Sequence, residues 1–345
     1  MTENIQLSYV NYYPSKEEIS HTIDRKTSKK YINWGDMNNM PQYLWDSYLQ
    51  CSNLQALVNT VTDYINGDGI ETTFTNYDDA ETLNDVIKKC TFDLVLFGGF
   101  AVECLRDSNK NITQVNYINV MNVRVDEDLT TAFLSNQWGS WSGKDVKTLP
   151  LYNSKKLQSH FILYYRGNIT RNINPVPMWF AALKSVEVLN ESRNYNLNNI
   201  KNNFNANTII ALNGTAIKSS EMEEIKEKLK NGYSGSDNAG KTLLINNTNS
   251  EGKVEITKLD NDKTTDLYKS VQESSVDDLY VAFRINPILL GINVATGFSR
   301  IEFVQAYTLY KFTTVNPIRQ SMTRAFASIG IDVTYKDFNF EFPEE

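Results

Sequence analysis

The stretch YSGSDNAGKTLLINN, residues 233–247, contains a spacing that is typical of a phosphate-binding site. Gly235, Gly240, Lys241 and Thr242 follow the order G-x-x-x-x-G-K-T, in which backbone N–H groups and a lysine hold the phosphates of ATP or GTP. Such a loop needs a strand before it and a helix after it, because the helix N-terminus helps to bind the phosphates. The sequence on both sides of the loop therefore decides whether this chemistry is available.

The sequence around this loop has the opposite order. Residues 218–232 predict a helix before the loop, with a capping box at Ser220 and Glu223 and a glycine where the chain leaves the helix. KTLLINN and KVEITKL predict strands after it. No apolar strand ending in an acidic residue follows to hold magnesium. We interpret the motif as a turn between a helix and a strand, and keep a P-loop nucleotide hydrolase as an alternative hypothesis.

Histidine and cysteine chemistry has little support in this sequence. His21 and His160 are the only histidines, so a histidine metal site or a catalytic triad would need both to be well placed, and we expect non-catalytic roles for each. Cys51, Cys90 and Cys104 form no C-x-x-C pair. An odd number of unpaired cysteines fits a reducing compartment, and we expect three small core residues.

The charge of the chain bears on its possible partners. The formal net charge is −7 and the isoelectric point is about 5.1, so no overall basic field attracts nucleic acid phosphates. The adjacent carboxylates Asp277 and Asp278, and Glu223 and Glu224, point apart on a helix, which predicts solvated faces. No run of eighteen apolar residues is present. We expect no catalytic residues, no metal, no cofactor and no membrane association.

The first half of the chain predicts an α+β unit. After an arm of mixed charge, apolar residues recur at helical spacing from residue 41 until the NGDG sequence at 66–69, which predicts two helices. A third helix runs from Leu83 to the glycines at 98 and 99. Strands are then predicted for four segments, FAVECLRD, ITQVNYINV, NVRVD and HFILYYRG.

Two long amphipathic helices are predicted in the second half. One begins at the prolines 175 and 177 and continues to Phe204, and the other covers 262–283 and stops before the Asn286-Pro287 pair. A short strand, TIIAL, follows the first helix. The residues expected to pack along these helices are Leu183, Val186, Leu267, Val271, Leu279 and Phe283. Because asparagine is a weak helix former, the first helix needs neighbours, which suggests an oligomer.

A loop of small residues, INVATGFS, precedes the last long helix. Ser299 and Glu302 form a capping box at the start of that helix. Arg284 and Arg300 flank the loop, where they could contact phosphates or form an ordinary salt bridge between helices. Three aromatic residues on one side of the helix favour core packing over base stacking. They are Phe303, Tyr307 and Tyr310.

Taken in order, these segments resemble the portal proteins of tailed double-stranded DNA bacteriophages over most of residues 31–320. The segments that carry the resemblance are WGDMNNMPQYLWDSY, YINVMNVRV, NNFNANTIIALNG, LKNGYSGSDNAGKTLLINN, DLYKSVQESSVDDLYVAFRINPILLG and VNPIRQ. The arm before them is not diagnostic, and the sequence after them is too short for the large crown of some portals.

The resemblance implies an α+β, portal-like fold with a two-helix stem. Its parts would be an arm (1–40), the first part of the wing (41–175), a stem helix (176–206), a small α/β clip (207–260), a second stem helix (261–286), the tunnel loop and helix as the second part of the wing (287–316), and a short crown-like C-terminal segment (317–345).

The resemblance also implies a function. The chain would assemble in the host cytoplasm into a homo-oligomeric ring of about twelve subunits at one capsid vertex of the virion, through which double-stranded DNA is packaged and ejected. Its partners would be the terminase packaging motor, the capsid, head–tail adaptors and, without sequence preference, the DNA. A phage adaptor that binds only proteins and forms no channel stays open as a third hypothesis.

Two sets of site residues come with this implied function. The tunnel loop that lines the DNA channel would be Asn293, Val294, Ala295, Thr296, Gly297, Phe298 and Ser299. The clip residues that contact the motor would be Tyr233, Ser234, Ser236, Asp237 and Asn238.

Overall fold

The computed structural model folds into two compact units, each built from separate stretches of the chain. The described residues are 23–27, 29–76, 81–138, 146–167, 171–201, 208–212, 254–258, 262–292 and 300–338. Unit 1 consists of Met1–Asp46, Val58–Met178 and Tyr307–Glu345, and unit 2 of Ser47–Leu57 and Trp179–Ala306. The two predicted helices between 41 and 66 are confirmed as α1 (Met40–Gln50) and α2 (Ser52–Asn66), and each contributes to both units.

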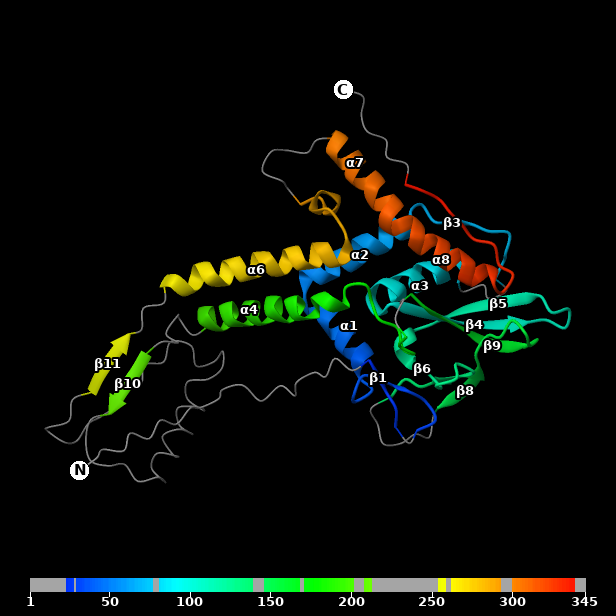
Figure 1. Cartoon of the computed structure of the whole chain (residues 1–345), viewed down its shortest axis with the longest axis horizontal. Coiled ribbons are helices and arrows are strands. Elements are labelled where there is room, and N and C mark those ends of the chain that lie inside the picture. The colour runs from blue at the N-terminus through cyan, green and yellow to red at the C-terminus, as the bar shows by residue number, and fades with distance from the viewer. Residues whose placement is uncertain are drawn as a thin grey trace. The chain divides into compact units, whose positions relative to one another are not determined.

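Small antiparallel sheets form the β-structure of unit 1 (Figure 1). One has the strand order β5-β4-β9, from β4 (Gly99–Arg106), β5 (Ile112–Ile118) and β9 (His160–Arg166). Another has the order β6-β7-β8, from β6 (Val123–Val125), β7 (Thr131–Leu134) and β8 (Lys147–Pro150). Two-stranded pairs join β1 (Asp24–Arg25) to β2 (Asn33–Trp34) and β3 (Ile70–Glu71) to β12 (Thr334–Tyr335). The four predicted strands are therefore confirmed, whereas β7 and β8 had not been predicted.

The two three-stranded sheets share an apolar core. A parallel bridge between Leu151 and Ile162 connects the end of β8 to β9. The buried residues that pack together there are Ala101, Val123, Val125, Ala132, Leu149, Leu151 and Ile162. Because β-strand side chains alternate between faces, β6 contributes Val123 and Val125 to this core.

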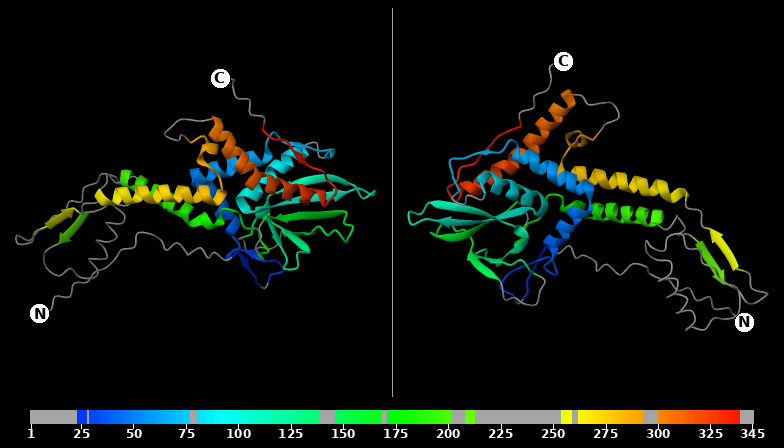
Figure 2. Two further views of the ribbon diagram at one scale, coloured as in Figure 1. Left: turned by 45° about the horizontal axis from the view of Figure 1, so that its top comes forward. Right: turned by 180° about the vertical axis from the view of Figure 1, so that it is seen from behind.

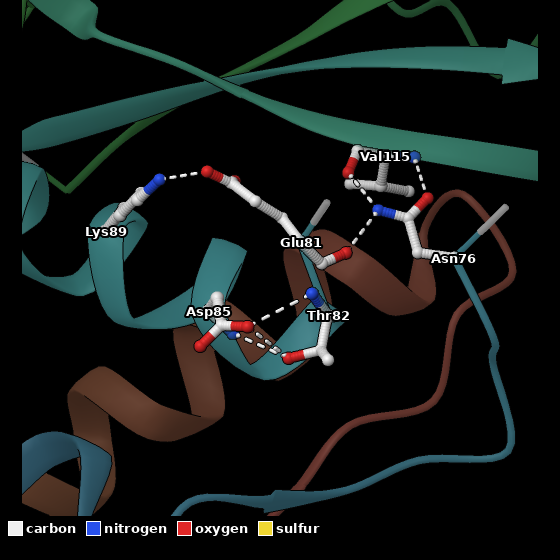
Figure 3. A network of polar contacts seen from close by, with 6 residues as sticks. All are labelled: Asn76, Glu81, Thr82, Asp85, Lys89 and Val115. Atoms are coloured by element: carbon white, nitrogen blue, oxygen red, sulfur yellow. Dashed lines mark hydrogen bonds and ion pairs between the residues drawn. The ribbon is translucent and has the colours of Figure 1, made fainter. Parts of the chain in front are cut away.

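Helix α3 (Leu83–Phe97) begins and ends where its sequence signals predict. Thr82 and Asp85 form a reciprocal capping box at its start (Figure 3). Gly98 ends the helix in the left-handed conformation. The Asn76 side chain donates to the backbone carbonyls of Glu81 and Val115 and accepts the Val115 N–H at 3.1 Å. This amide ties the segment before α3 to the edge of β5.

A buried arginine joins the N-terminal segment to β6. The Arg124 guanidinium donates to the carbonyls of Asn38, Met121 and Val123 at 2.8–3.0 Å. It also lies over the rings of Trp34 and Trp138, with 5.5 and 4.8 Å to the ring centroids. Burial lowers the pKa of Arg124 to about 9. The side chain therefore stays charged at neutral pH, and it depends on carbonyl dipoles and aromatic faces to offset its desolvation.

The chain from Tyr307 onward belongs to unit 1, and the helix that leads into it starts in unit 2. Helix α7 (Arg300–Tyr310) continues through a π-helical turn (Lys311–Val315) into α8 (Asn316–Ala327). The Phe326 ring of α8 stacks on Phe100 of β4, with 5.8 Å between centroids and 9° between planes. The sequence had separated 287–316 from 317–345, but the helical backbone runs across that division. Pro317 does not end the helix, because the wider π turn before it accommodates its missing N–H.

Unit 2 is centred on a pair of long helices, α4 (Leu183–Lys201) and α6 (Asp262–Phe283). They lie side by side and antiparallel, as Figures 1 and 2 show, and the Ser185 hydroxyl near the start of α4 donates to Asp278 near the end of α6 at 2.8 Å. Strands β10 (Thr208–Leu212) and β11 (Val254–Lys258) pair antiparallel, and both had been predicted. The predicted start of the first helix at Pro177 is wrong, since a 3-10 turn (Phe180–Ala182) precedes α4.

Candidate assembly and channel surfaces

Four of the six residues that were expected to pack along α4 and α6 are buried. Leu183 and Val186 of α4 and Leu279 and Phe283 of α6 are buried. Val271 is 38% exposed, so its predicted packing role is not fulfilled within the subunit. The Leu267 side chain lies outside the described side chains. The predicted burial is therefore confirmed for Leu183, Val186, Leu279 and Phe283, and the assignment of these helices to a portal stem stays a prediction.

A buried tryptophan just before α4 packs against the end of this pair. Trp179 is completely buried, and its ring stacks on Phe283 with 6.4 Å between centroids and 14° between planes. It lies before α4, at the start of the 3-10 turn, with φ −89° and ψ 3°. The large aromatic contact explains why the chain bends here instead of starting the α-helix earlier.

The end of α6 presents one of the two candidate phosphate contacts. Arg284 takes a left-handed φ of 55°, its N–H bonds the Val281 carbonyl at 3.0 Å, and its side chain is exposed. Among the described residues it forms no ion pair, and whether it contacts phosphate or another helix stays a prediction. Arg300 is also exposed, at the start of α7.

Several predicted site residues lie outside the described residues. They are the phosphate-loop motif at 235–242, the helix at 218–232 with its capping residues Ser220 and Glu223, the capping residue Ser299, the clip residues Tyr233, Ser234, Ser236, Asp237 and Asn238, the whole tunnel loop from Asn293 to Ser299, and His21. Their positions stay as predictions.

Helix α7 and the π turn carry apolar side chains on two opposite faces. On one face Tyr310 is buried, and Tyr64 lies against Tyr307 and Tyr310 with centroids 5.6 and 5.9 Å apart, which confirms core packing for these two aromatics. On the other face Ile301 and Phe312, about three turns apart, are each 68% exposed. Leu309, on the flank of that face, is 66% exposed. An exposed apolar face of this kind suits an interface with another molecule.

The three cysteines and His160 have surroundings typical of residues that stabilise a fold. The three cysteines are buried free thiols, as predicted, and burial raises the pKa of Cys104 to about 12. His160 contacts the Glu103 carboxylate at 2.6 Å, and Lys147 lies 3.2 Å from the same oxygen. In the described part of the chain, no group of three or more His, Cys, Asp or Glu side chains could hold a metal ion. None of the helices described is long and apolar enough to cross a membrane.

The comparison with known families identifies the class of protein. The family model described as phage portal protein matches residues 76–342, which is more than half of the chain. The chain belongs to the phage portal protein family. Among curated proteins, none matches this chain in sequence.

Solved structures of portal and neck assemblies share the fold. A chain of the virion of a native gene transfer agent particle is similar with a TM-score of 0.55 and 12% identity, covering 86% of this chain and 83% of that one. A chain from the neck of the native particle, computed with C12 symmetry, has the same TM-score and identity. The HK97-family phage portal protein from Corynebacterium diphtheriae has a TM-score of 0.53 and 11% identity, covering 84% and 94%. The mixed helix–strand fold is therefore that of portal structures.

Proposed function

We propose that this chain assembles into a closed ring of about twelve copies that forms the DNA channel at the portal vertex of a virion. The family match over residues 76–342 carries the proposal. The similar neck chains come from assemblies computed with C12 and C6 symmetry, which supports a symmetric ring. Portal proteins are structural, so we further propose that the chain has no catalytic activity of its own, needs no cofactor and leaves DNA translocation to a terminase motor.

Within this proposal, the exposed face of α7 is covered by a second copy of the chain. Ile301, Leu309 and Phe312 together present a large apolar surface, whereas the aromatic face of the same helix is already packed. A ring offers each subunit the same neighbour on each side, so one such face per subunit is buried throughout. Val281 on α6 is 76% exposed and is a further apolar side chain available for such contacts.

Phe312→Asp is expected to abolish ring formation while the subunit stays folded. The carboxylate would have to be buried without a partner in the interface, whereas in the free subunit the residue is mostly exposed and the substitution should change the free energy of unfolding by less than about 0.5 kcal/mol. Native mass spectrometry and negative-stain imaging measure assembly. Phe312→Leu, which keeps an apolar side chain, is the matched control and should assemble. Rings of Phe312→Asp would show that α7 does not form the interface.

The channel would be lined by the loop from Asn293 to Ser299, with Arg284 and Arg300 as its candidate phosphate contacts. The clip at residues 207–260 would meet the terminase motor through Tyr233, Ser234, Ser236, Asp237 and Asn238, with other contacts to the capsid and to head–tail adaptors. Assembly in the host cytoplasm before incorporation into the capsid completes the proposal. These assignments follow from the order of the segments in the sequence and from the family.

Deleting Ala295 to Gly297 is expected to leave folding and ring formation close to wild type but to impair DNA packaging or retention in infected cells. A short loop of small residues contributes little burial, so the cost to stability is small. Packaged genome per particle is the measurement. Replacing the same three residues by Ser-Gly-Ser keeps the length of the loop and should retain packaging. Normal packaging by the deletion variant would remove the channel role from this loop.

Two alternatives are separated by simple measurements. A P-loop nucleotide hydrolase would bind ATP through Lys241, and Lys241→Ala would abolish that binding. An adaptor that binds proteins only would give a native mass without a closed ring. A ring with an axial hole in negative-stain images supports the portal proposal over both.

A further inference from the structure

A cavity on unit 1 concentrates positive charge in an otherwise acidic protein. It lies between the end of the α7–α8 helical run and β12, has a volume of about 570 Å³, and is lined in part by Lys311, Arg319 and Arg324. Asp337 is the single carboxylate in its lining. Three cations against one carboxylate give a local excess of positive charge, although the chain as a whole has a net charge of −7.

Two of these cations are fixed before any ligand arrives. The Arg319 guanidinium donates to the Ile65 carbonyl at 2.7 Å and to Asp337 at 2.6 Å, and it lies over the Tyr335 ring, 5.2 Å from its centroid. Lys311 Nζ contacts the other Asp337 oxygen at 2.6 Å. Partial burial opposes the charged form of Asp337, but its contacts with Lys311 and Arg319 outweigh burial and lower its pKa.

Arg324 is the cation that remains available in the cavity. Its side-chain donors have only long contacts with its own helix, to the Gln320 carbonyl at 3.3 Å and to the Ser321 hydroxyl at 3.4 Å. It is exposed, and none of the carboxylates in the described part of the chain pairs with it. Four uncharged amide and hydroxyl side chains also line the cavity. They are Asn316, Gln320, Thr323 and Thr334.

We propose that this cavity binds a phosphate group through Arg324, with the neighbouring amide and hydroxyl groups as supporting donors. A planar guanidinium with several N–H donors suits the several acceptor oxygens of a phosphate, and the fixed charges of Lys311 and Arg319 add to the positive potential of the cavity. The volume is in the range of small-ligand sites, so it has room for a nucleoside attached to the phosphate. The phosphate could belong to a free nucleotide or to the backbone of duplex DNA. The inference uses only unit 1 and does not depend on ring formation.

The test measures binding of three probes to the full chain at low salt: inorganic phosphate, deoxyadenosine 5′-monophosphate and a short blunt DNA duplex. Arg324→Gln is expected to raise the Kd about ten-fold or more, because one charge-assisted contact is lost, and added salt should weaken binding further. Since Arg324 is exposed, the variant should fold as wild type, which circular dichroism checks. Lys88→Gln, which removes one positive charge from an exposed site on α3, is the matched control and should bind normally.

The probes also identify the source of the phosphate. If the mononucleotide binds and Arg324→Gln weakens this binding, the site is a nucleotide site. If only the duplex binds and Arg324→Gln weakens its binding, the site holds a DNA backbone phosphate. The proposal is overturned if none of the probes binds, if Arg324→Gln binds as wild type does, or if Lys88→Gln weakens binding equally. Nucleotide binding lost in Lys241→Ala but kept in Arg324→Gln would also overturn it in favour of the phosphate-loop motif. Ring formation, measured separately by native mass, tests the proposed function and not this site.

Discussion

Phe283→Ala is expected to lower the free energy of unfolding of the subunit by about 3–5 kcal/mol. The Phe283 side chain is completely buried at the end of α6, where its ring stacks on the equally buried Trp179. Truncation would remove the transfer free energy of the ring and leave a cavity that two rigid helices cannot easily close. Urea unfolding followed by circular dichroism measures the change.

Val281→Ala is the matched control for this substitution. It lies on the same helix two residues earlier, but its side chain is 76% exposed, so the expected change is within about 0.5 kcal/mol. Equal stabilities of Phe283→Ala and wild type would mean that the α4–α6 contact does not hold unit 2 together. A loss of ring formation in Val281→Ala without a loss of stability would instead place Val281 in the subunit interface.

The elements that could be predicted from the sequence are those with local signals at both ends. Helix α6 was predicted at 262–283 and has these bounds, because a regular apolar stripe ends at an asparagine–proline pair that disfavours helix. Helix α3 likewise has a capping box at Thr82 and a glycine at 98. In both cases the residues that define the boundary are within one turn of it.

The elements that were missed depend on contacts between distant residues. Strands β7 and β8 have four residues each, and they become strands by pairing with each other and with β6. The start of α4 moved from the predicted Pro177 because Trp179 packs on Phe283, far along the chain. Such tertiary contacts override local helix propensity.

Buried charges are the part of the structure that the sequence predicts least well. Arg124 occupies the middle of the V-R-V strand β6, where alternation would give it a solvent-facing position. Trp34 and Trp138, from different segments, cover it instead. The cavity around Arg324 was also not predicted, because Lys311, Arg319 and Asp337 come together only when the chain after α8 returns to β3.

A buried carboxylate on α3 provides a second test with a large expected effect. Asp93 is 1% exposed, and one of its oxygens accepts hydrogen bonds from the Tyr117 hydroxyl at 3.0 Å and the Val120 N–H at 3.1 Å. Burial raises its pKa from 3.8 to about 7, which the two hydrogen bonds only partly oppose. Burial also raises the pKa of the neighbouring Cys90 thiol and Tyr117 phenol, so these groups stay neutral in the same pH range.

The sign of the pH dependence follows from this raised pKa. Between pH 4 and 7 the folded state binds more protons at Asp93 than the unfolded state does, so stability falls as pH rises through this window and levels off above it. Asp93→Asn cannot titrate. The stability of this variant relative to wild type is therefore expected to increase by about 4 kcal/mol between pH 4 and pH 8.

Urea unfolding of both proteins at pH 4, 7 and 8 measures this difference and avoids the isoelectric point near 5.1. Asp85→Asn on the same helix is the control with the opposite sign, because hydrogen bonds from Thr82 lower the pKa of Asp85 and its charged form is the stabilising one. The free energy of unfolding of Asp85→Asn should fall further below that of wild type as pH rises from the acid range. A stability difference between Asp93→Asn and wild type that does not change with pH would show that Asp93 is hydrated or paired in solution, and that α3 does not bury a protonated acid.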